Sequence, residues 1–114
     1  MNDLMRPALY QAHHDILPLQ EATAGTAQTT YDIVGPICES TDKFAAQRDM
    51  PEVPAGSRIA FMSSGAYGAV LSSQYNARPL VAEVLVDGDQ FALVRRRPSF
   101  DEMIQLEQMP DWLT

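Results

Sequence analysis

The sequence predicts a small, mainly β fold with short helices. Residues 80–86 and 90–95 are rich in β-branched and apolar side chains, and they flank the dipeptide Asp87-Gly88. Asp-Gly favours a tight turn with positive φ, so we expect these two segments to pair as an antiparallel hairpin. Residues 31–34 and 57–62 are two further strand candidates. The chain of 114 residues shows no internal repeat and is expected to form one domain.

The segments before residue 57 are less regular. Residues 1–20 combine prolines and histidines with apolar positions and have no clean period, whereas residues 21–30 are small and polar, which is typical of a loop. Gly35-Pro36 ends the strand candidate 31–34. Three good N-caps then follow, and we expect a turn or two of helix over residues 44–47. These caps are Ser40, Thr41 and Asp42.

Two later segments carry clear local signals. Gly65 and Gly68 flank Ala66-Tyr67, and glycine at these positions is expected to permit positive φ and close approach of the backbone to a ligand. Ser99-Phe100-Asp101-Glu102 has the pattern of a capping box. It predicts a terminal helix that includes Met103, Ile104 and Leu106 and is closed by Pro110.

Charge and composition exclude several classes of function. Eight lysines and arginines face fifteen acids, giving a net charge of −7, so a nucleic-acid surface is not expected. The run Arg95-Arg96-Arg97 is expected to be a solvated strand end. No apolar stretch approaches the length of a membrane span, and no signal peptide opens the chain. A single cysteine, Cys38, allows no internal disulfide, which favours a cytoplasmic location.

Three groups of residues could bind or transform a ligand. Cys38 could donate a proton and the adjacent Glu39 could bind a cation, although a structural cysteine beside a surface acid is the commoner arrangement. Arg6 and Tyr10, four residues apart, could hold an anion or be solvated on a helix surface. Tyr67 could be presented to a ligand by the glycines around it, or lie in a plain turn.

His13-His14-Asp15 is a weak candidate for a metal site. Adjacent side chains point in different directions, so they chelate one ion poorly, and no other cluster completes a ligand set. We therefore expect a structural role for the two histidines and no bound metal.

Several segments occur in an order that resembles one known family. They are residues 1–10 (MNDLMRPALY), 34–40 (VGPICES), 65–68 (GAYG), 72–79 (SSQYNARP), 82–88 (AEVLVDG) and 95–97 (RRR). Over essentially the whole chain, this order is similar to that of the diaminopimelate decarboxylases. The closing residues 109–113 (MPDWL) resemble the natural C-terminus of such enzymes.

The resemblance implies a fold and an activity. Members of this family are homodimeric fold-type III decarboxylases, whose (β/α)₈ barrel binds pyridoxal 5′-phosphate through a lysine and whose C-terminal β domain packs against the partner's barrel. They convert meso-diaminopimelate to L-lysine and carbon dioxide, the last step of lysine synthesis. The chain would be the C-terminal domain without the barrel, a small antiparallel β-barrel or sandwich like that of alanine-racemase-like decarboxylases. Residues 1–28 would be the junction from the barrel and residues 29–114 the β domain.

The resemblance also implies a role for each candidate residue. Arg6 and Tyr10 would hold the distal carboxylate of the substrate, and Glu39 would bind its distal ammonium group. Cys38 would donate the proton that replaces carbon dioxide, in the active site of the partner subunit. Tyr67 would contact both the substrate and the cofactor.

Two departures from the family pattern bear on these roles. The family commonly has glycine where this chain has Thr41, which affects the backbone freedom of the loop that carries Cys38 and Glu39. Lys43, the only lysine, does not match the lysine that binds the cofactor, so the chain alone is expected to be inactive. One alternative is a non-catalytic β module that binds a partner chain. Another is part of an ornithine- or arginine-type decarboxylase, against which Glu39 argues because such relatives usually have aspartate after the cysteine.

Overall fold

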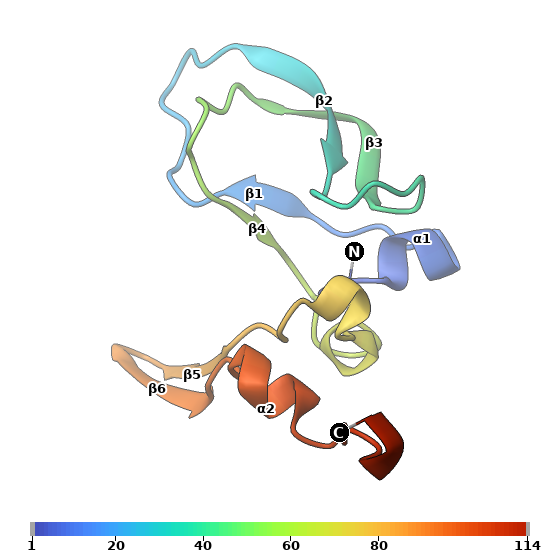
Figure 1. Cartoon of the computed structure of the whole chain (residues 1–114). Coiled ribbons are helices and arrows are strands. Elements are labelled where there is room, and N and C mark those ends of the chain that lie inside the picture. The colour runs from blue at the N-terminus through green and yellow to red at the C-terminus, as the bar shows by residue number, and fades with distance from the viewer. Residues whose placement is uncertain (1, 114) are drawn as a thin grey trace. The chain divides into compact units, whose positions relative to one another are not determined.

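The computed structural model describes residues 2–113, which divide into two units (Figure 1). Residues 3–72 form the first unit, and residues 73–113 together with Asn2 form the second. The prediction of a mainly β chain with short helices is confirmed. The strands form three separate antiparallel pairs, and no closed barrel exists among residues 2–113, so the term barrel is too specific. No helix in this range is long and apolar enough to span a bilayer.

The elements follow one another as short segments. In chain order they are α1 (Arg6–Tyr10), β1 (Ile16–Pro18), β2 (Gln28–Val34), β3 (Lys43–Pro51), β4 (Ile59–Phe61), β5 (Glu83–Asp87), β6 (Gln90–Arg95) and α2 (Phe100–Ile104). Three short 3₁₀ turns cover Ala69–Leu71, Tyr75–Ala77 and Asp111–Leu113.

The longest pairing joins β2 to β3. It runs from Gln28 opposite Pro51 to Val34 opposite Lys43 and is interrupted by a bulge near Asp32. At the bulge, Gln47 adopts a left-handed φ of 47°, and its N–H donates to Asp32 Oδ1 at 2.8 Å. This hydrogen bond, followed by that from Lys43 Nζ, lowers the pKa of the Asp32 carboxyl below its usual value. The side chain of Asp32 therefore replaces the ladder bond that the bulge removes.

The prediction of a helix over residues 44–47 is wrong, because these residues belong to β3. A helix of one or two turns is marginal by itself, since its nucleation is not offset by enough hydrogen bonds. Pairing with β2 supplies those bonds, and Phe44 also packs its ring on Phe61 of β4, with the centroids 4.9 Å apart. Tertiary pairing therefore overrides the local cap pattern before residue 44.

The small core of the first unit lies around β1. This strand pairs with β4, and Ile16 lies opposite Phe61; the strand expected over residues 57–62 is confirmed only at its centre. The buried apolar side chains among residues 2–113 include Leu4, Pro7, Ile16 and Met50. Helix α1 packs against β3 and so brings the N-terminal segment to the β2–β3 pair.

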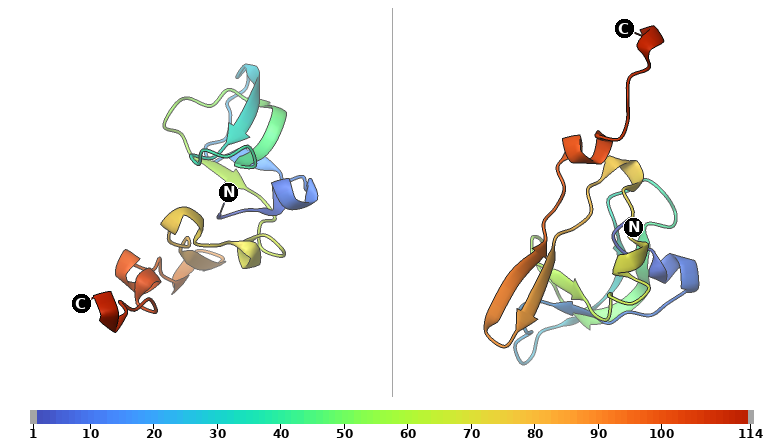
Figure 2. Two further views of the ribbon diagram at one scale, coloured as in Figure 1. Left: turned by 45° about the vertical axis from the view of Figure 1, so that its right-hand side comes forward. Right: turned by 90° about the horizontal axis from the view of Figure 1, so that it is seen from below.

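The predicted hairpin of the second unit is confirmed (Figure 2). Asp87 pairs with Gln90 across the turn, and the central residues are Gly88 and Asp89. Gly88 has the positive φ, 60°, that the Asp-Gly pattern predicts, whereas Asp89 does not have one, as in a type II′ turn. Strand β5 begins at Glu83, three residues later than the sequence indicates.

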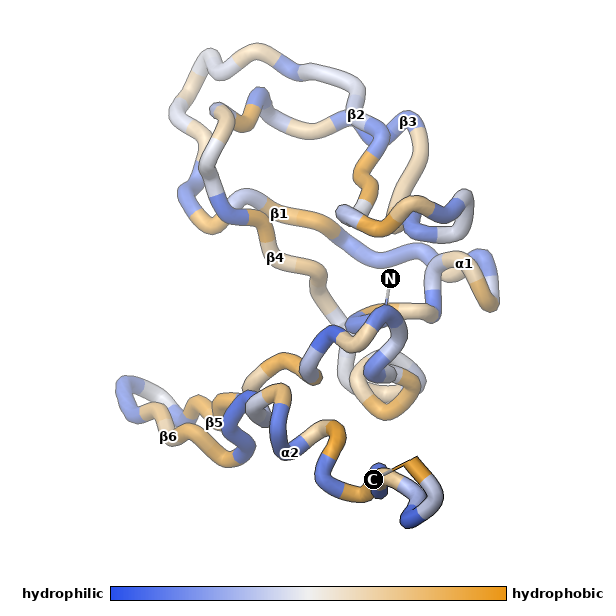
Figure 3. The backbone as a smooth tube through the Cα atoms, viewed as in Figure 1, coloured by the Kyte–Doolittle hydropathy of each residue, from blue (hydrophilic) through white to orange (hydrophobic). Residues whose placement is uncertain are grey.

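The hairpin exposes apolar side chains on both faces, because successive residues of a strand point to opposite sides. Figure 3 shows the apolar run along β5 and β6. At the open end, Arg95 forms a half-exposed ion pair with Glu83, with 2.8 Å between nitrogen and oxygen. The side chains that are more than half exposed are Val84, Leu85, Val86, Phe91, Leu93 and Val94.

Helix α2 begins at the predicted capping box. Ser99 Oγ accepts from the Glu102 N–H at 3.2 Å, and Glu102 Oε2 accepts from the Ser99 N–H at 2.8 Å. The helix ends at Ile104, so the predicted inclusion of Leu106 is wrong. Arg96 forms a two-point ion pair with Glu102, and this pair and the Ser99 N–H lower the pKa of the Glu102 carboxyl from 4.5 to about 2.

We predict that the cap of α2 persists in acid until about pH 2. A carboxyl with a depressed pKa stabilises the folded state fully above its unfolded value and loses that contribution as the pH falls through the folded value. The amide signal of Ser99, followed by NMR, should therefore titrate near pH 2, the pKa of Glu102.

The matched controls are the neighbouring arginines. Arg96→Gln removes the main cause of the shift and should move the Ser99 titration toward the ordinary glutamate pKa of 4.5. Arg97→Gln should leave it in place. A Ser99 signal that titrates near the ordinary value in the unmodified chain would contradict the arrangement.

Candidate functional site

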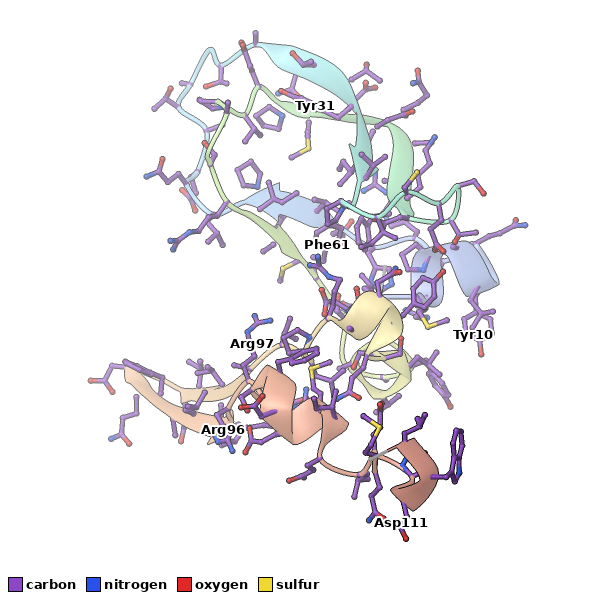
Figure 4. All side chains as sticks on the ribbon, viewed as in Figure 1. Tyr10, Tyr31, Phe61, Arg96, Arg97 and Asp111 are labelled. Carbon is purple, nitrogen blue, oxygen red and sulfur yellow. The ribbon has the colours of Figure 1, made fainter. Side chains whose placement is uncertain are left out.

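The five residues for which the sequence predicts a role lie in the first unit, on three segments. Helix α1 carries Arg6 and Tyr10, and Pro7 suits its first turn, where a helix leaves N–H groups unpaired. Residues four apart lie on one helix face, so the two side chains can approach one ligand. Tyr10 is 59% exposed, and Figure 4 marks it beside α1, whereas Arg6 is half-buried.

The second segment is the loop 35–42, which joins β2 to β3 and carries Cys38 and Glu39. It is closed by the Gly35 N–H, which donates to the Asp42 carbonyl at 2.9 Å. Within the loop, the Glu39 N–H donates to the Ile37 carbonyl at 2.8 Å. The Cys38 thiol is exposed and Glu39 is half-buried. These hydrogen bonds within the loop place the side chains of Cys38 and Glu39 at the end of the β2–β3 pair.

Thr41, the departure from the family pattern, does not strain this loop. Its φ is not in the left-handed region, so the backbone at this position does not require glycine. Its hydroxyl donates instead to Glu39 Oε1. The threonine therefore orients the carboxylate rather than disturbing it.

The third segment is the turn 63–68, which carries Tyr67. Its positive φ values lie at Ser63 and at Tyr67 itself, 56° and 55°, and not at Gly65 or Gly68. Neither glycine uses the positive φ that its lack of a side chain permits. A tyrosine in this conformation costs about 1–2 kcal/mol, and such residues cluster at functional sites. The turn holds the Tyr67 side chain 67% exposed.

Gly68 is needed for space rather than for φ. A Cβ on this residue would lie 2.0 Å from the Ser64 carbonyl oxygen and 3.1 Å from Leu4 Cδ1. The same carbonyl accepts the Ala69 N–H at 2.7 Å, which closes the turn. The missing side chain thus lets the turn of Tyr67 lie against the segment that leads into α1.

The three segments lie in the first unit, but their functional side chains do not pair with one another. Leu4, just before α1, lies 3.1 Å from the position that a Cβ on Gly68 would take, and α1 packs against β3, which follows the Cys38 loop. Among residues 2–113, no hydrogen bond or ion pair joins any two of the five side chains. Two open hollows of this structure lie elsewhere, along residues 15–28 and 48–58, and none of the five lines them.

The histidines and Lys43 have structural partners. His14 is buried and its Nδ1–H donates to the Met62 carbonyl at 2.9 Å, while Arg48 donates to the His14 carbonyl. Within residues 2–113, no three His, Cys, Asp or Glu side chains form a metal-binding group. Lys43 Nζ lies 3.1 Å from Asp32 Oδ2 at the bulge. This ion pair gives Lys43 a structural role within the β2–β3 pair.

Asp42 is a residue that the sequence analysis misplaced. It was expected to cap a helix, but its side chain is buried inside the loop 35–42. The sequence offers one signal for this role: Asp42 directly precedes β3, at the end of the loop that begins with Gly35-Pro36.

Comparison with known proteins agrees with this architecture. The sequence profile described as "Pyridoxal-dependent decarboxylase, C-terminal sheet domain" matches residues 1–65, more than half of the 114 residues. The chain belongs to this family. The matched range includes four of the five predicted site residues and ends within the turn 63–68, two residues before Tyr67.

Individual relatives extend the similarity to the whole chain. The diaminopimelate decarboxylase of Zymomonas mobilis is 50% identical over 99% of this chain and 26% of its own length. That of Vibrio cholerae is 51% identical over 96% of this chain and 25% of its own length. The structure of the M. jannaschii diaminopimelate decarboxylase in complex with L-lysine superposes with a TM-score of 0.89 at 33% identity, covering all of this chain and 26% of that one. The chain thus spans about a quarter of the curated relatives that it matches.

We predict that Gly68→Ala opens the Tyr67 turn. The test protein is a chimera in which residues 1–114 replace the segment that they match in the Z. mobilis enzyme. The new Cβ would clash with the Ser64 carbonyl, so the hydrogen bond from Ala69 should be lost. Overpacking costs about 1–3 kcal/mol, so hydrogen exchange of the Ala69 amide should accelerate about 5–150-fold.

Gly65→Ala is the matched control. A Cβ there meets nothing within 4 Å and its φ is not left-handed, so exchange at Ala69 should not change. Equal exchange in the two variants would show that Gly68 is not a packing requirement.

Proposed function

We propose that this chain is the C-terminal part of a diaminopimelate decarboxylase, a pyridoxal-phosphate-dependent carboxy-lyase that converts meso-2,6-diaminopimelate to L-lysine and carbon dioxide. The observation that carries the proposal is similarity over 99% of the chain to an enzyme of that name, at 50% identity. The complex of the M. jannaschii enzyme with L-lysine supports lysine as the product. No finding favours the non-catalytic module or the ornithine-type alternative.

The substrate explains why the chain offers a cation and an anion. Diaminopimelate has an amino-acid group at each end, so a second binding set is needed away from the cofactor. Arg6 can bind the distal carboxylate through two parallel N–H···O bonds, with the Tyr10 hydroxyl beside it on α1. Glu39 can bind the distal ammonium, and Thr41 holds the Glu39 carboxylate in place. Arg6 and Glu39 would thus bind the carboxylate and the ammonium of the distal amino-acid group, respectively.

Cys38 is proposed to supply the proton. Its Sγ–H can protonate the carbon from which carbon dioxide departs, because a positioned thiol can act as a general acid. The thiol is exposed on its loop, so a reacting atom can approach it. Glu39, the next residue, would hold the far end of the same substrate.

The cofactor would come from the part of the enzyme that this chain does not contain. Pyridoxal phosphate supplies an electron sink for decarboxylation when it is bound. In this chain, Tyr67 is the residue proposed to contact it, because the turn 63–68 holds that ring exposed. The lysine that holds the cofactor would lie elsewhere in the enzyme.

The proposed assembly is a cytoplasmic homodimer in lysine biosynthesis, with active sites composed of residues from both subunits. The exposure of Tyr10, Cys38 and Tyr67 supports it, since side chains that bind a small substrate are normally enclosed. A surface from outside this chain would have to cover them.

We expect the 114 residues expressed alone neither to bind pyridoxal phosphate covalently nor to decarboxylate diaminopimelate. The reason is that Lys43 is engaged by Asp32 and the chain spans about a quarter of its relatives. Borohydride reduction followed by mass spectrometry should find no cofactor on Lys43. Such an adduct, lost in Lys43→Arg, would contradict the assignment.

We predict that Cys38→Ala in the Z. mobilis chimera lowers kcat much more than it changes KM. General acid catalysis contributes about 10²–10⁴-fold, and it acts in the transition state, so the loss should fall in that range. The release of L-lysine from diaminopimelate measures it.

Glu39→Gln and Arg6→Ala provide the contrast. Each removes a contact to the bound substrate and should raise KM more than it lowers kcat. A Cys38→Ala variant with normal kcat and raised KM would rule out the acid role and make Cys38 a packing or binding residue.

A further inference from the structure

The loop that carries Cys38 and Glu39 closes around the side chain of Asp42. This aspartate is only 3% exposed, and its Oδ2 accepts the Ile37 N–H at 2.7 Å. Its own N–H donates to the Glu39 carbonyl at 3.2 Å. The residues on both sides of Cys38 are therefore bonded to one buried residue.

Gly35 completes this arrangement from the other end of the loop. Its N–H donates to the Asp42 carbonyl at 2.9 Å. A Cβ on Gly35 would lie 2.2 and 2.3 Å from the two carboxylate oxygens of Asp42, which is closer than real atoms approach. Gly35 does not have positive φ, so glycine is needed here for space. The side chain of Asp42 occupies the volume that any other residue at position 35 would fill.

The bond from Ile37 is the strong constraint of the loop. Burial of Asp42 removes the water that would otherwise compete for the Ile37 N–H. The contact between Thr41 and Glu39, in contrast, is exposed and orients one side chain only. Without the Asp42 carboxylate, the Ile37 N–H would lose its acceptor and the loop would lose its tie between the Cys38 side and β3.

We infer that Asp42 is a positioning residue for the reaction, and that Gly35 leaves the space that the Asp42 side chain occupies: the buried side chain holds the loop 35–42 so that Cys38 and Glu39 face the substrate together. The inference rests on the proposed roles of Cys38 and Glu39. Asp42 itself does not touch the substrate; it acts on both residues through the backbone of the loop.

The first test compares variants of the Z. mobilis chimera. Asp42→Ala should lower kcat and raise KM together, each by about 10–100-fold, because the Ile37 N–H loses its buried acceptor and both side chains are displaced. Asp42→Asn keeps an acceptor oxygen of the same shape and should recover most of the activity. Asp49→Ala, which removes an exposed carboxylate from β3, should change neither constant.

A double-mutant cycle separates positioning from general destabilisation. In the Cys38→Ala background, Asp42→Ala should lower kcat less than about threefold further, since the proton donor that it positions is already gone. Equal losses of kcat in both backgrounds would overturn the inference. Gly35→Ala should reproduce the defect of Asp42→Ala and add little to it, because alanine at position 42 leaves room for the new Cβ.

The hydrogen bond that Asp42 makes in the loop can be measured without an activity assay. The inference and the proposed function can therefore fail separately. Hydrogen exchange of the Ile37 amide should accelerate about 10–100-fold in Asp42→Ala and in Gly35→Ala, but not in Asp49→Ala. Unchanged exchange at Ile37 would overturn the inference whatever the kinetics. Normal kcat in Cys38→Ala would overturn the proposed acid role, and with it the part of the inference that concerns Cys38.

Discussion

The antiparallel pairing of β2 with β3 is the constraint on which the first unit depends. Its last pair, Val34 with Lys43, sets the separation of the two ends of the loop that carries Cys38 and Glu39. Helix α1 packs on β3, and Phe44 of β3 contacts Phe61 of β4. With few fully buried apolar side chains in the described chain, this ladder and its contacts supply much of the order of the unit.

The parts of the fold that the sequence predicts well are those decided by a few neighbouring residues. The Gly88 turn and the Ser99–Glu102 capping box are examples, because each is fixed by backbone freedom or by hydrogen bonds within four residues. The helix predicted over residues 44–47 failed for the opposite reason. Its local signals are real, but the partner strand that overrules them begins sixteen residues before Phe44, at Gln28. The residues around 44–47 do not indicate a strand pairing with a segment so far away in the sequence.

The candidate site divides in the same way. Arg6 and Tyr10 can be placed on one helix face from their spacing, and the loop position of Cys38 follows from Gly35-Pro36. The positive φ of Tyr67 could not be predicted, because the sequence suggests that the neighbouring glycines take that conformation. Gly68 is required instead for space, and the atoms that fill this space belong to Ser64 and Leu4. Asp42 was misplaced because an aspartate two residues before Phe44 looks the same whether it caps a helix or closes a loop. The roles of the five residues came from family resemblance, since a lone cysteine beside an acid carries no unique chemistry.

The apolar side chains on both faces of the β5–β6 hairpin have a consequence for strand register. In most sheets, sliding one strand by one residue exposes the buried face and buries polar groups, which forbids the slip. Here a slip would exchange one apolar face for another, so hydrophobic patterning does little to select the alignment. The ion pair between Glu83 and Arg95 is half-exposed, and such pairs contribute about 0–1 kcal/mol. The alignment of the two strands is therefore specified mainly by one backbone angle, that of Gly88.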